Sequence, residues 1–421
     1  MGHWAENGRL AAASPPQLLA PALSKTGFDA TIEKEDGGYS SAAERLTVAQ
    51  DVVGSIPTSR PNVPPAWTSD PPHLRVPVTQ IPLKDTESNA EFSLRAPALP
   101  AFVPHRGLSN GHLQTIVGNF LPRPAFRLAA TAELVMVDPS DGSRVLCHCH
   151  WQPDPAACLT LVLVHGLEGS SDSRYIHGVA GRAWAAGCNL VRMNMRNCGG
   201  TEELTPTLYH SGLSGDVAAV VRHFAARFAL QRVALVGYSM GGNLVLKMAG
   251  EWGVEAPLCA VAAVCPAIDL AAGSDALHEP ANRLYEWRFL LGLMARFRRK
   301  ARLYPHIYHS TKVGPVRSLR EFDGKVLAAY SEFRDADDYY DRAASARVVD
   351  RIAVPTLILH AQDDPFIRLR AETRAKLQAN AKIALVETRH GGHCAFLCRE
   401  RGEEIHWAEA AVMRFLLSVT E

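Results

Sequence analysis

A serine between two glycines follows an apolar segment in the middle of the chain. The segment Val233 to Val236 has the composition of a buried strand, and Gly237-Tyr238-Ser239-Met240-Gly241 follows it directly. A Gly-x-Ser-x-Gly sequence between a strand and a helix is typical of a sharp turn that exposes the serine hydroxyl as a nucleophile. The helix that follows directs its N-terminal amides toward the same point, which favours an oxyanion. The pattern therefore predicts that Ser239 attacks an acyl carbon.

A serine nucleophile needs a base and an acidic group that orients the base. Downstream lie Asp363-Asp364-Pro365 and then His390-Gly391-Gly392-His393, in the chain order nucleophile, acid, histidine. We predict that Asp364 is the acid because it directly precedes the proline, and that Asp363 caps the loop. We predict that His393 is the base because the two glycines before it allow a tight turn. His390 is the alternative base.

The oxyanion formed in such a reaction needs two backbone N–H donors. One is expected from Met240, the residue after the nucleophile. The other is expected from the loop after the apolar segment Leu159 to His165, which reads His165-Gly166-Leu167-Glu168-Gly169. Glycine at the end of a strand lets this loop approach a substrate carbonyl closely. We therefore predict that the amides of Leu167 and Met240 form the oxyanion hole.

Strands and helices must bring these separate loops to one edge of a sheet. From Arg144 onward, short runs of buried-strand composition alternate with stretches of helical periodicity. Such units predict an α/β fold with a mostly parallel central sheet, flanking helices and the site at the carboxyl ends of the strands. The expected strands are Leu159 to His165, Asn189 to Met193, Val233 to Val236, Cys259 to Val264, Thr356 to Leu359 and Ile383 to Val386, and the expected helices are Tyr175 to Ala186, Gly212 to Phe228 and Ser239 to Trp252.

About 90 residues separate the strand that ends near Pro266 from the strand that starts near Thr356. This interval predicts a helical cap insertion over the site at about residues 268–345. Its clearest element is a helix from Glu286 to Tyr304, whose apolar face is expected to wall the acyl site. That face includes Leu290, Met294 and Phe297, while Arg296, Arg298, Arg299, Lys300 and Arg302 are expected on a solvated face, with a surface for phosphate groups or membranes as the alternative.

The first 95 residues differ in composition from the rest of the chain. Thirteen of the 27 prolines lie within the first 100 residues, and apolar periodicity is weak there. We interpret residues 1–95 as a proline-rich, largely irregular N-terminal extension, with a docking arm as the alternative. Residues 96–421 are then expected to form one domain that carries the cap insertion.

Composition and charge argue against several classes of protein. The 44 basic and 43 acidic residues leave a net charge of +1, so no nucleic-acid partner is predicted. No apolar run has the length of a transmembrane segment, and prolines interrupt the N-terminal region where a signal peptide would lie. The nine cysteines are scattered, which is typical of a reduced, cytoplasmic protein. The sequence gives no indication of the oligomeric state.

No cofactor and no metal site is predicted. Nucleotide-binding glycine motifs are missing from the sequence. Cys147-His148-Cys149-His150 contains four potential metal ligands, but alternate side chains of a strand point to opposite faces, so the four cannot converge on one ion. Cys394 and Cys398, close to the expected base, are interpreted as packing residues rather than as a redox pair.

Several segments besides the serine turn occur together in one known family. They are Asn110-Gly111-His112-Leu113-Gln114-Thr115, His165-Gly166-Leu167-Glu168-Gly169, Arg196-Asn197-Cys198-Gly199-Gly200, Leu208-Tyr209-His210-Ser211-Gly212, Glu321-Phe322-Asp323, Asp338-Tyr339-Tyr340, Asp363-Asp364-Pro365-Phe366 and Gly391-Gly392-His393. With them, the chain from about Phe102 to its C-terminus resembles the YheT-like branch of the α/β-hydrolases (AB hydrolase family four). The resemblance implies an α/β-hydrolase fold with a helical cap, a triad of Ser239, Asp364 and His393, and a carboxylesterase activity. Eukaryotic relatives act on acyl esters and phospholipids, which implies a role in lipid metabolism.

The residues and the resemblance together predict a serine esterase. It is expected to cleave carboxylic esters of short to medium acyl chains through an acyl-enzyme, with a small-molecule acyl ester as its partner. One alternative is an acyltransferase that uses the same triad with an alcohol or thiol as acceptor. The other alternative is a non-catalytic α/β-hydrolase that binds a ligand in the same pocket. The segment His112-Leu113-Gln114-Thr115 is expected to be structural, packing a helix on the sheet.

Overall fold

The computed structural model describes residues 99–123, 126–309, 313–399 and 405–420. All of them belong to one compact unit, Pro72–Glu421. The predicted extension, residues 1–95, lies outside the described residues. No helix in these four ranges is long and apolar enough to cross a membrane.

The core is an eight-stranded sheet with the spatial order β1-β2-β4-β3-β5-β6-β7-β8. The first two strands are antiparallel to their neighbours, and the remaining pairs are parallel. This arrangement confirms the predicted mostly parallel sheet. The strands are β1 (Thr131–Asp138), β2 (Ser143–His150), β3 (Thr160–Val164), β4 (Asn189–Met193), β5 (Val233–Tyr238), β6 (Ala260–Val264), β7 (Thr356–Ala361) and β8 (Ile383–Thr388).

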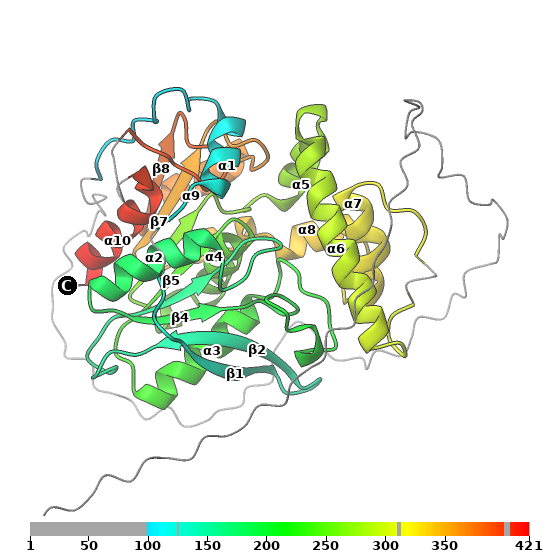
Figure 1. Ribbon diagram of the computed structural model, residues 1–421, viewed down its shortest axis with the longest axis horizontal. Helices are drawn as coiled ribbons and strands as arrows, with labels where there is room; N and C mark the ends of the chain where they lie inside the picture. Colours follow the sequence, from blue (N-terminus) through cyan, green and yellow to red (C-terminus); the bar gives the residue numbers. More distant parts are fainter. Residues whose placement is uncertain (1–98, 124–125, 310–312, 400–404, 421) are drawn as a thin grey trace, which may run out of the picture. The chain divides into compact units, whose positions relative to one another are not determined.

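Helices cover both faces of the sheet (Figure 1). One face packs against α2 (Arg174–Ala185) and α10 (Trp407–Thr420), and the other against α3 (Ser214–Phe228) and α4 (Met240–Trp252). Every residue of β3, β4, β5, β6 and β7 is consequently buried, which explains their continuous apolar composition. The remaining helices outside the insertion are α1 (Gly111–Phe120) and α9 (Ala371–Ala379).

The chain between β6 and β7 forms a group of helices (Figure 1). It contains α5 (Leu270–His278), α6 (Arg283–Leu303), α7 (Leu319–Phe322) and α8 (Ala336–Ala343), joined by short 3₁₀ and π turns. We call residues 265–355 the insertion. The longest helix, α6, begins three residues earlier than the predicted start at Glu286. A helical segment at this point of the chain is therefore confirmed.

Two basic residues of α6 depart from the expected solvated face. Arg296 is only 8% exposed, and Lys300 is fully buried. Nζ of Lys300 donates to the carbonyl oxygens of Glu202 and Thr205, in the segment after β4. The sequence could not show these partners, because they lie about 100 residues away along the chain. The prediction of a uniformly solvated basic face was therefore wrong.

The side chains of β2 alternate as expected for a strand. Cys147 and Cys149 are buried in the core cluster that contains α3. His148 lies on the other face, where its Nδ1 is 2.7 Å from Oγ of Ser171. His150 packs against the Trp184 ring of α2. The cysteines and histidines of this segment therefore face opposite sides of the sheet.

Candidate active site

Ser239 lies in a sharp turn between the end of β5 and the start of α4. Its backbone has φ +54° and ψ −117°, in a region that residues other than glycine rarely adopt. The flanking Gly237 and Gly241 are required here, because a Cβ on either residue would overlap backbone atoms. The Ser239 N–H donates to the carbonyl oxygen of Val264 at 2.9 Å, which ties the turn to the end of β6. The predicted nucleophile therefore occupies a strained and well-anchored position.

The predicted acid and base are in direct contact. Nδ1 of His393 lies 2.8 Å from Oδ2 of Asp364, which is 1% exposed. The other carboxylate oxygen, Oδ1, accepts the N–H groups of Phe366 at 3.1 Å and Ile367 at 2.9 Å. The Phe366 ring packs on the imidazole with a centroid separation of 4.2 Å. Asp364 is thus fixed by two backbone donors and holds one nitrogen of the histidine.

This contact changes the protonation of both groups. Burial of the imidazole opposes its charge, but the charge and the hydrogen bond of Asp364, with a smaller contribution from Cys265, outweigh burial and raise the pKa of His393. Burial alone would raise the pKa of Asp364, but the charge and the hydrogen bond of His393, with the two backbone donors, lower it. The carboxylate is therefore ionised at neutral pH, and it strengthens His393 as a proton acceptor.

The structure does not join Ser239 to His393 by a hydrogen bond within the described ranges. Nε2 of the imidazole instead lies 3.7 Å from Sγ of Cys394. The thiol of Cys394 and the N–H of Ser239 both point to the carbonyl oxygen of Val264, at 3.6 Å and 2.9 Å. The backbone of the nucleophile and the side chain of the residue after the base therefore contact one carbonyl oxygen. Hydrogen bonds between such groups are often long before substrate binds.

The neighbouring acid and histidine occupy different positions. Oδ1 of Asp363 accepts the N–H of Gly392 at 2.8 Å, so this carboxylate fixes the histidine loop, as its expected capping role requires. Nδ1 of His390 lies 3.5 Å from the other Asp363 oxygen. Of the two histidines, His393 is the one that contacts Asp364. The geometry thus favours His393 over the alternative, His390.

Helix α1 positions the histidine loop, which the sequence did not indicate. Oγ1 of Thr115 accepts the N–H of His393 at 2.8 Å and donates to the carbonyl oxygen of Gly111 at 2.7 Å. The side chain of Gln114 accepts the N–H of Leu397 at 2.9 Å and donates to its carbonyl oxygen at 3.0 Å. Because 278 residues separate Thr115 from His393, spacing along the chain carries no signal of this contact. Only the resemblance pointed to this segment.

The two predicted oxyanion donors are the backbone N–H groups of Leu167 and Met240. Gly166 donates its N–H to the Tyr175 hydroxyl at 2.9 Å, and Glu168 donates to the Tyr209 hydroxyl at 3.4 Å. Leu167, between them, and Met240, the first residue of α4, have no intramolecular N–H acceptor within the ranges described above. Both residues line the same cavity as Ser239. Their amides are therefore available to a substrate oxygen.

An apolar cavity of about 120 Å³ opens beside Ser239. Its lining joins Leu167 and Met240 to residues of the insertion, including Leu277, Phe289 and Leu293. The prediction of the wall residues was wrong, because none of Leu290, Met294 and Phe297 belongs to this lining. Phe297 packs instead against the rings of Tyr308 and Tyr330, inside the insertion. Helix α6 does wall the cavity, but with a neighbouring stripe of its surface.

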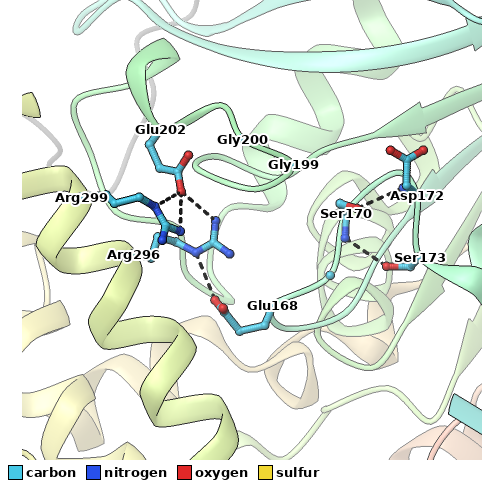
Figure 2. Close-up of a pocket in the computed structure, with 10 residues that line it drawn as sticks. Glu168, Ser170, Asp172, Ser173, Gly199, Gly200, Glu202, Arg296 and Arg299 are labelled. Atoms are coloured by element: carbon cyan, nitrogen blue, oxygen red, sulfur yellow. Dashed lines mark hydrogen bonds and ion pairs between the residues drawn. The ribbon is translucent and has the colours of Figure 1, made fainter. Parts of the chain in front are cut away.

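A second, polar cavity of about 560 Å³ lies beside the Leu167 loop (Figure 2). Arg296 and Arg299 extend into it from α6. Nε of Arg296 lies 3.1 Å from Oε1 of Glu168, and Nε of Arg299 lies 2.8 Å from Oε1 of Glu202. Because Glu168 directly follows Leu167, the Arg296 ion pair ties the insertion to the loop that carries the expected oxyanion donor, and the Arg299 ion pair ties it to the segment after β4.

Comparison with known proteins identifies relatives over most of the chain. Residues 161–405 match the model of the alpha/beta hydrolase family. The chain is 33% identical over 346 residues to the Escherichia coli (strain K12) protein named "Putative esterase YheT", which covers 80% of this chain and 97% of that protein.

Two further relatives are more distant. "Phospholipase ABHD3" of Mus musculus is 31% identical over 239 residues, 56% of this chain and 58% of that protein. "Medium-chain fatty acid ethyl ester synthase/esterase 2" of Saccharomyces cerevisiae is 25% identical over 287 residues, 62% of each protein.

Proposed function

Because this chain belongs to the alpha/beta hydrolase family and is similar to the YheT protein over nearly all of that protein's length, we propose that it is a serine esterase. It cleaves carboxylic esters of short to medium acyl chains through an acyl-enzyme. The observation that carries the proposal is the contact of 2.8 Å between Asp364 and His393 beside the strained Ser239 turn. The catalytic unit is residues 96–421, with a cap at about residues 268–345.

Each group has one role in the proposed reaction. Oγ of Ser239 attacks the ester carbonyl as Nε2 of His393 accepts the hydroxyl proton, and the amides of Leu167 and Met240 stabilise the oxyanion. His393 then donates this proton to the leaving alcohol. Asp364 keeps the proton of the neutral imidazole on Nδ1 and stabilises the imidazolium. Water repeats the sequence on the acyl-enzyme and releases the acid.

The lining of the apolar cavity supports a preference for acyl chains over acetate. Phe289 and Leu293 present apolar surface beside the nucleophile, and each buried methylene contributes about 0.8 kcal/mol. The small volume of about 120 Å³ favours short to medium chains. We expect kcat/KM to rise from acetate toward medium-chain esters and then to decline.

A fluorophosphonate probe tests the proposal on the full chain. We expect the wild type to be labelled covalently, and Ser239→Ala to remain unlabelled. Ser331→Ala is the matched control, because its hydroxyl donates to the Leu327 carbonyl and does not line the cavity. Equal labelling of Ser239→Ala would refute Ser239 as the nucleophile, and no labelling of folded wild type would favour the non-catalytic alternative.

An acyltransferase is the second candidate function. It is favoured by the similarity to the Saccharomyces protein, whose name includes both an ester synthase and an esterase. The two reactions share the acyl-enzyme and differ in whether water or an alcohol receives the acyl group. Incubation of a medium-chain ester with graded ethanol separates them. Ester exchange that exceeds hydrolysis at low ethanol would identify the transferase.

A further inference from the structure

Two thiols and one nitrogen of the proposed base lie together beside the Ser239 turn. One ligand atom each from Cys265, His393 and Cys394 lies within 4.8 Å of the others. Nε2 of His393 is 3.7 Å from Sγ of Cys394, whereas Nδ1 contacts Asp364. The nitrogen that the proposed mechanism uses as proton acceptor therefore points toward the thiols.

The backbone holds both thiols in place. Cys265 has φ +43° and Cys394 has φ +60°, which residues with a side chain rarely adopt. Sγ of Cys265 accepts the N–H of Cys394 at 3.4 Å. The Cys394 thiol points to the Val264 carbonyl oxygen, which also accepts the N–H of Ser239. With Ser239 at φ +54°, three residues around this point have a strained backbone, which supports a functional constraint rather than simple packing.

The donor set matches a soft or borderline metal ion. Two sulfurs and one imidazole nitrogen are ligands that zinc binds in proteins, with a fourth position left open. Tetrahedral zinc, with bonds of about 2.3 Å to sulfur and 2.0 Å to nitrogen, separates its ligand atoms by roughly 3.5–3.8 Å. The distance of 3.7 Å between Nε2 and Sγ of Cys394 already meets this spacing.

The surroundings of the cluster also suit a metal ion. The His393 side chain is 13% exposed, and Cys394 is half-buried, so an ion can enter from the solvent side. Asp364 holds the other imidazole nitrogen, as carboxylates commonly do for a histidine that binds a metal. No regular spacing signals the cluster, because Cys265 precedes the other two ligands by 128 and 129 residues.

We propose that Cys265, Cys394 and His393 bind zinc or another thiophilic divalent cation, and that the bound ion inhibits the enzyme. Binding releases the two thiol protons and, where the imidazole is protonated, one imidazole proton to solvent, and it forms two metal–sulfur bonds and one metal–nitrogen bond without any oxidation. The ion then occupies the Nε2 lone pair, so His393 cannot accept the proton of Ser239. The proposal that the bound ion inhibits the enzyme rests on the proposed esterase function, whereas the proposal of a metal site does not.

Direct binding measurements test the site independently of activity. The reduced full chain, freed of metal by a chelator and desalted, is titrated with Zn²⁺ against a chromophoric competitor. We expect one more equivalent bound by the wild type than by the Cys265→Ser/Cys394→Ser variant. Cys394→Ser is a milder change at a half-buried position, and we expect it to lower the affinity for this additional Zn²⁺ at least about tenfold. The control, Cys158→Ser, removes a thiol outside the cluster and should bind as the wild type does.

Cadmium provides a spectroscopic readout of the same ligands. The ultraviolet cadmium–thiolate band of the wild type should correspond to two thiolates at this site, and Cys394→Ser should lose half of that amplitude. Circular dichroism establishes that each variant is folded. Equal Zn²⁺ stoichiometry and affinity in the wild type and the double variant would overturn the site.

Inhibition is measured on a chromogenic ester in buffered free Zn²⁺. We expect the activity of the wild type to fall with the midpoint found by titration and to return when EDTA is added. Inhibition of Cys394→Ser should require a Zn²⁺ concentration at least about tenfold higher. Unchanged hydrolysis at saturating Zn²⁺ would overturn the proposed inhibition by the bound ion. If the metal-free wild type hydrolyses no ester, the proposed function fails, and the titration alone still decides the metal site.

Discussion

Replacing Asp364 with asparagine tests the proposed mechanism most sharply, because it removes one charge and keeps nearly the same shape. The carboxylate contacts His393 at 2.8 Å and is almost fully buried. With an effective dielectric constant of about 20, opposite charges about 4 Å apart attract by about 4 kcal/mol. Loss of that attraction to the imidazolium alone should lower turnover by roughly 10³-fold.

The asparagine amide adds a second defect. If its NH₂ group faces Nδ1, the imidazole carries its proton on Nε2 and cannot accept one from Ser239. We therefore expect kcat on a p-nitrophenyl ester to fall by about 10⁴-fold in Asp364→Asn. Asp363→Asn is the matched control. Its Oδ1 can still accept the Gly392 N–H, so its kcat should stay within about threefold of wild type.

The pH profile gives an independent readout of the same contact. The base must be neutral, so kcat/KM rises as pH increases through the pKa of His393. Because Asp364 raises this pKa above the ordinary 6.5, the acid limb of the wild type should lie above that value. Without the carboxylate, the residual activity should rise at lower pH. A loss below tenfold in Asp364→Asn, or a larger loss in Asp363→Asn, would refute the assignment of the acid.

Three further predictions concern the cavity, the insertion and the histidine loop. Leu293→Ala should reduce the gain in kcat/KM per acyl methylene, by up to about fourfold for each methylene that no longer packs against this side chain. Met294→Ala should leave the gain per methylene unchanged. The measurement is kcat/KM over a series of esters of increasing acyl length. Burial lowers the pKa of Lys300 to about 7 from 10.5, so the wild type should gain stability from pH 7 toward pH 10, by up to about 1.4 kcal/mol per pH unit. Urea unfolding of Lys300→Met should lack this gain, and equal slopes would contradict it. Thr115→Ala should lower kcat about tenfold by freeing the His393 N–H, and Thr115→Ser should restore it; equal kcat in both variants would exclude this role.

Local patterns were sufficient to predict the sheet and the serine turn. The strands β3 to β7 carry continuous apolar runs because helices bury both of their faces, so their composition is diagnostic. The edge strand β1 was not predicted, because its residues are mostly exposed or half-buried and its apolar pattern is weak. The order nucleophile, acid, histidine selected Asp364 and His393, whose contact the structure contains.

Contacts between distant segments could not be predicted from these patterns. Lys300 can be fully buried because carbonyl groups of the segment after β4 accept hydrogen bonds from its Nζ. Nothing near Lys300 in the chain indicates these partners. The choice between Leu293 and Met294 as a wall residue depends on a rotation of α6 of about 100°, one residue of a helix. Periodicity defines an apolar face, but it does not define which edge of that face meets a ligand.

The histidine loop shows how such distant contacts combine into one functional constraint. Four side chains fix it: Thr115 of α1 accepts the His393 N–H, Asp363 accepts the Gly392 N–H, Asp364 contacts Nδ1, and Cys265 accepts the Cys394 N–H. With these groups fixed, the imidazole retains one free ring nitrogen, Nε2, and little freedom to move it. On the proposed function, that nitrogen must serve Ser239 during turnover, and the adjacent thiols compete for it whenever a thiophilic ion is present. Proton transfer and metal binding therefore exclude each other at a single atom, so zinc should abolish turnover by occupying the base while leaving the fold intact.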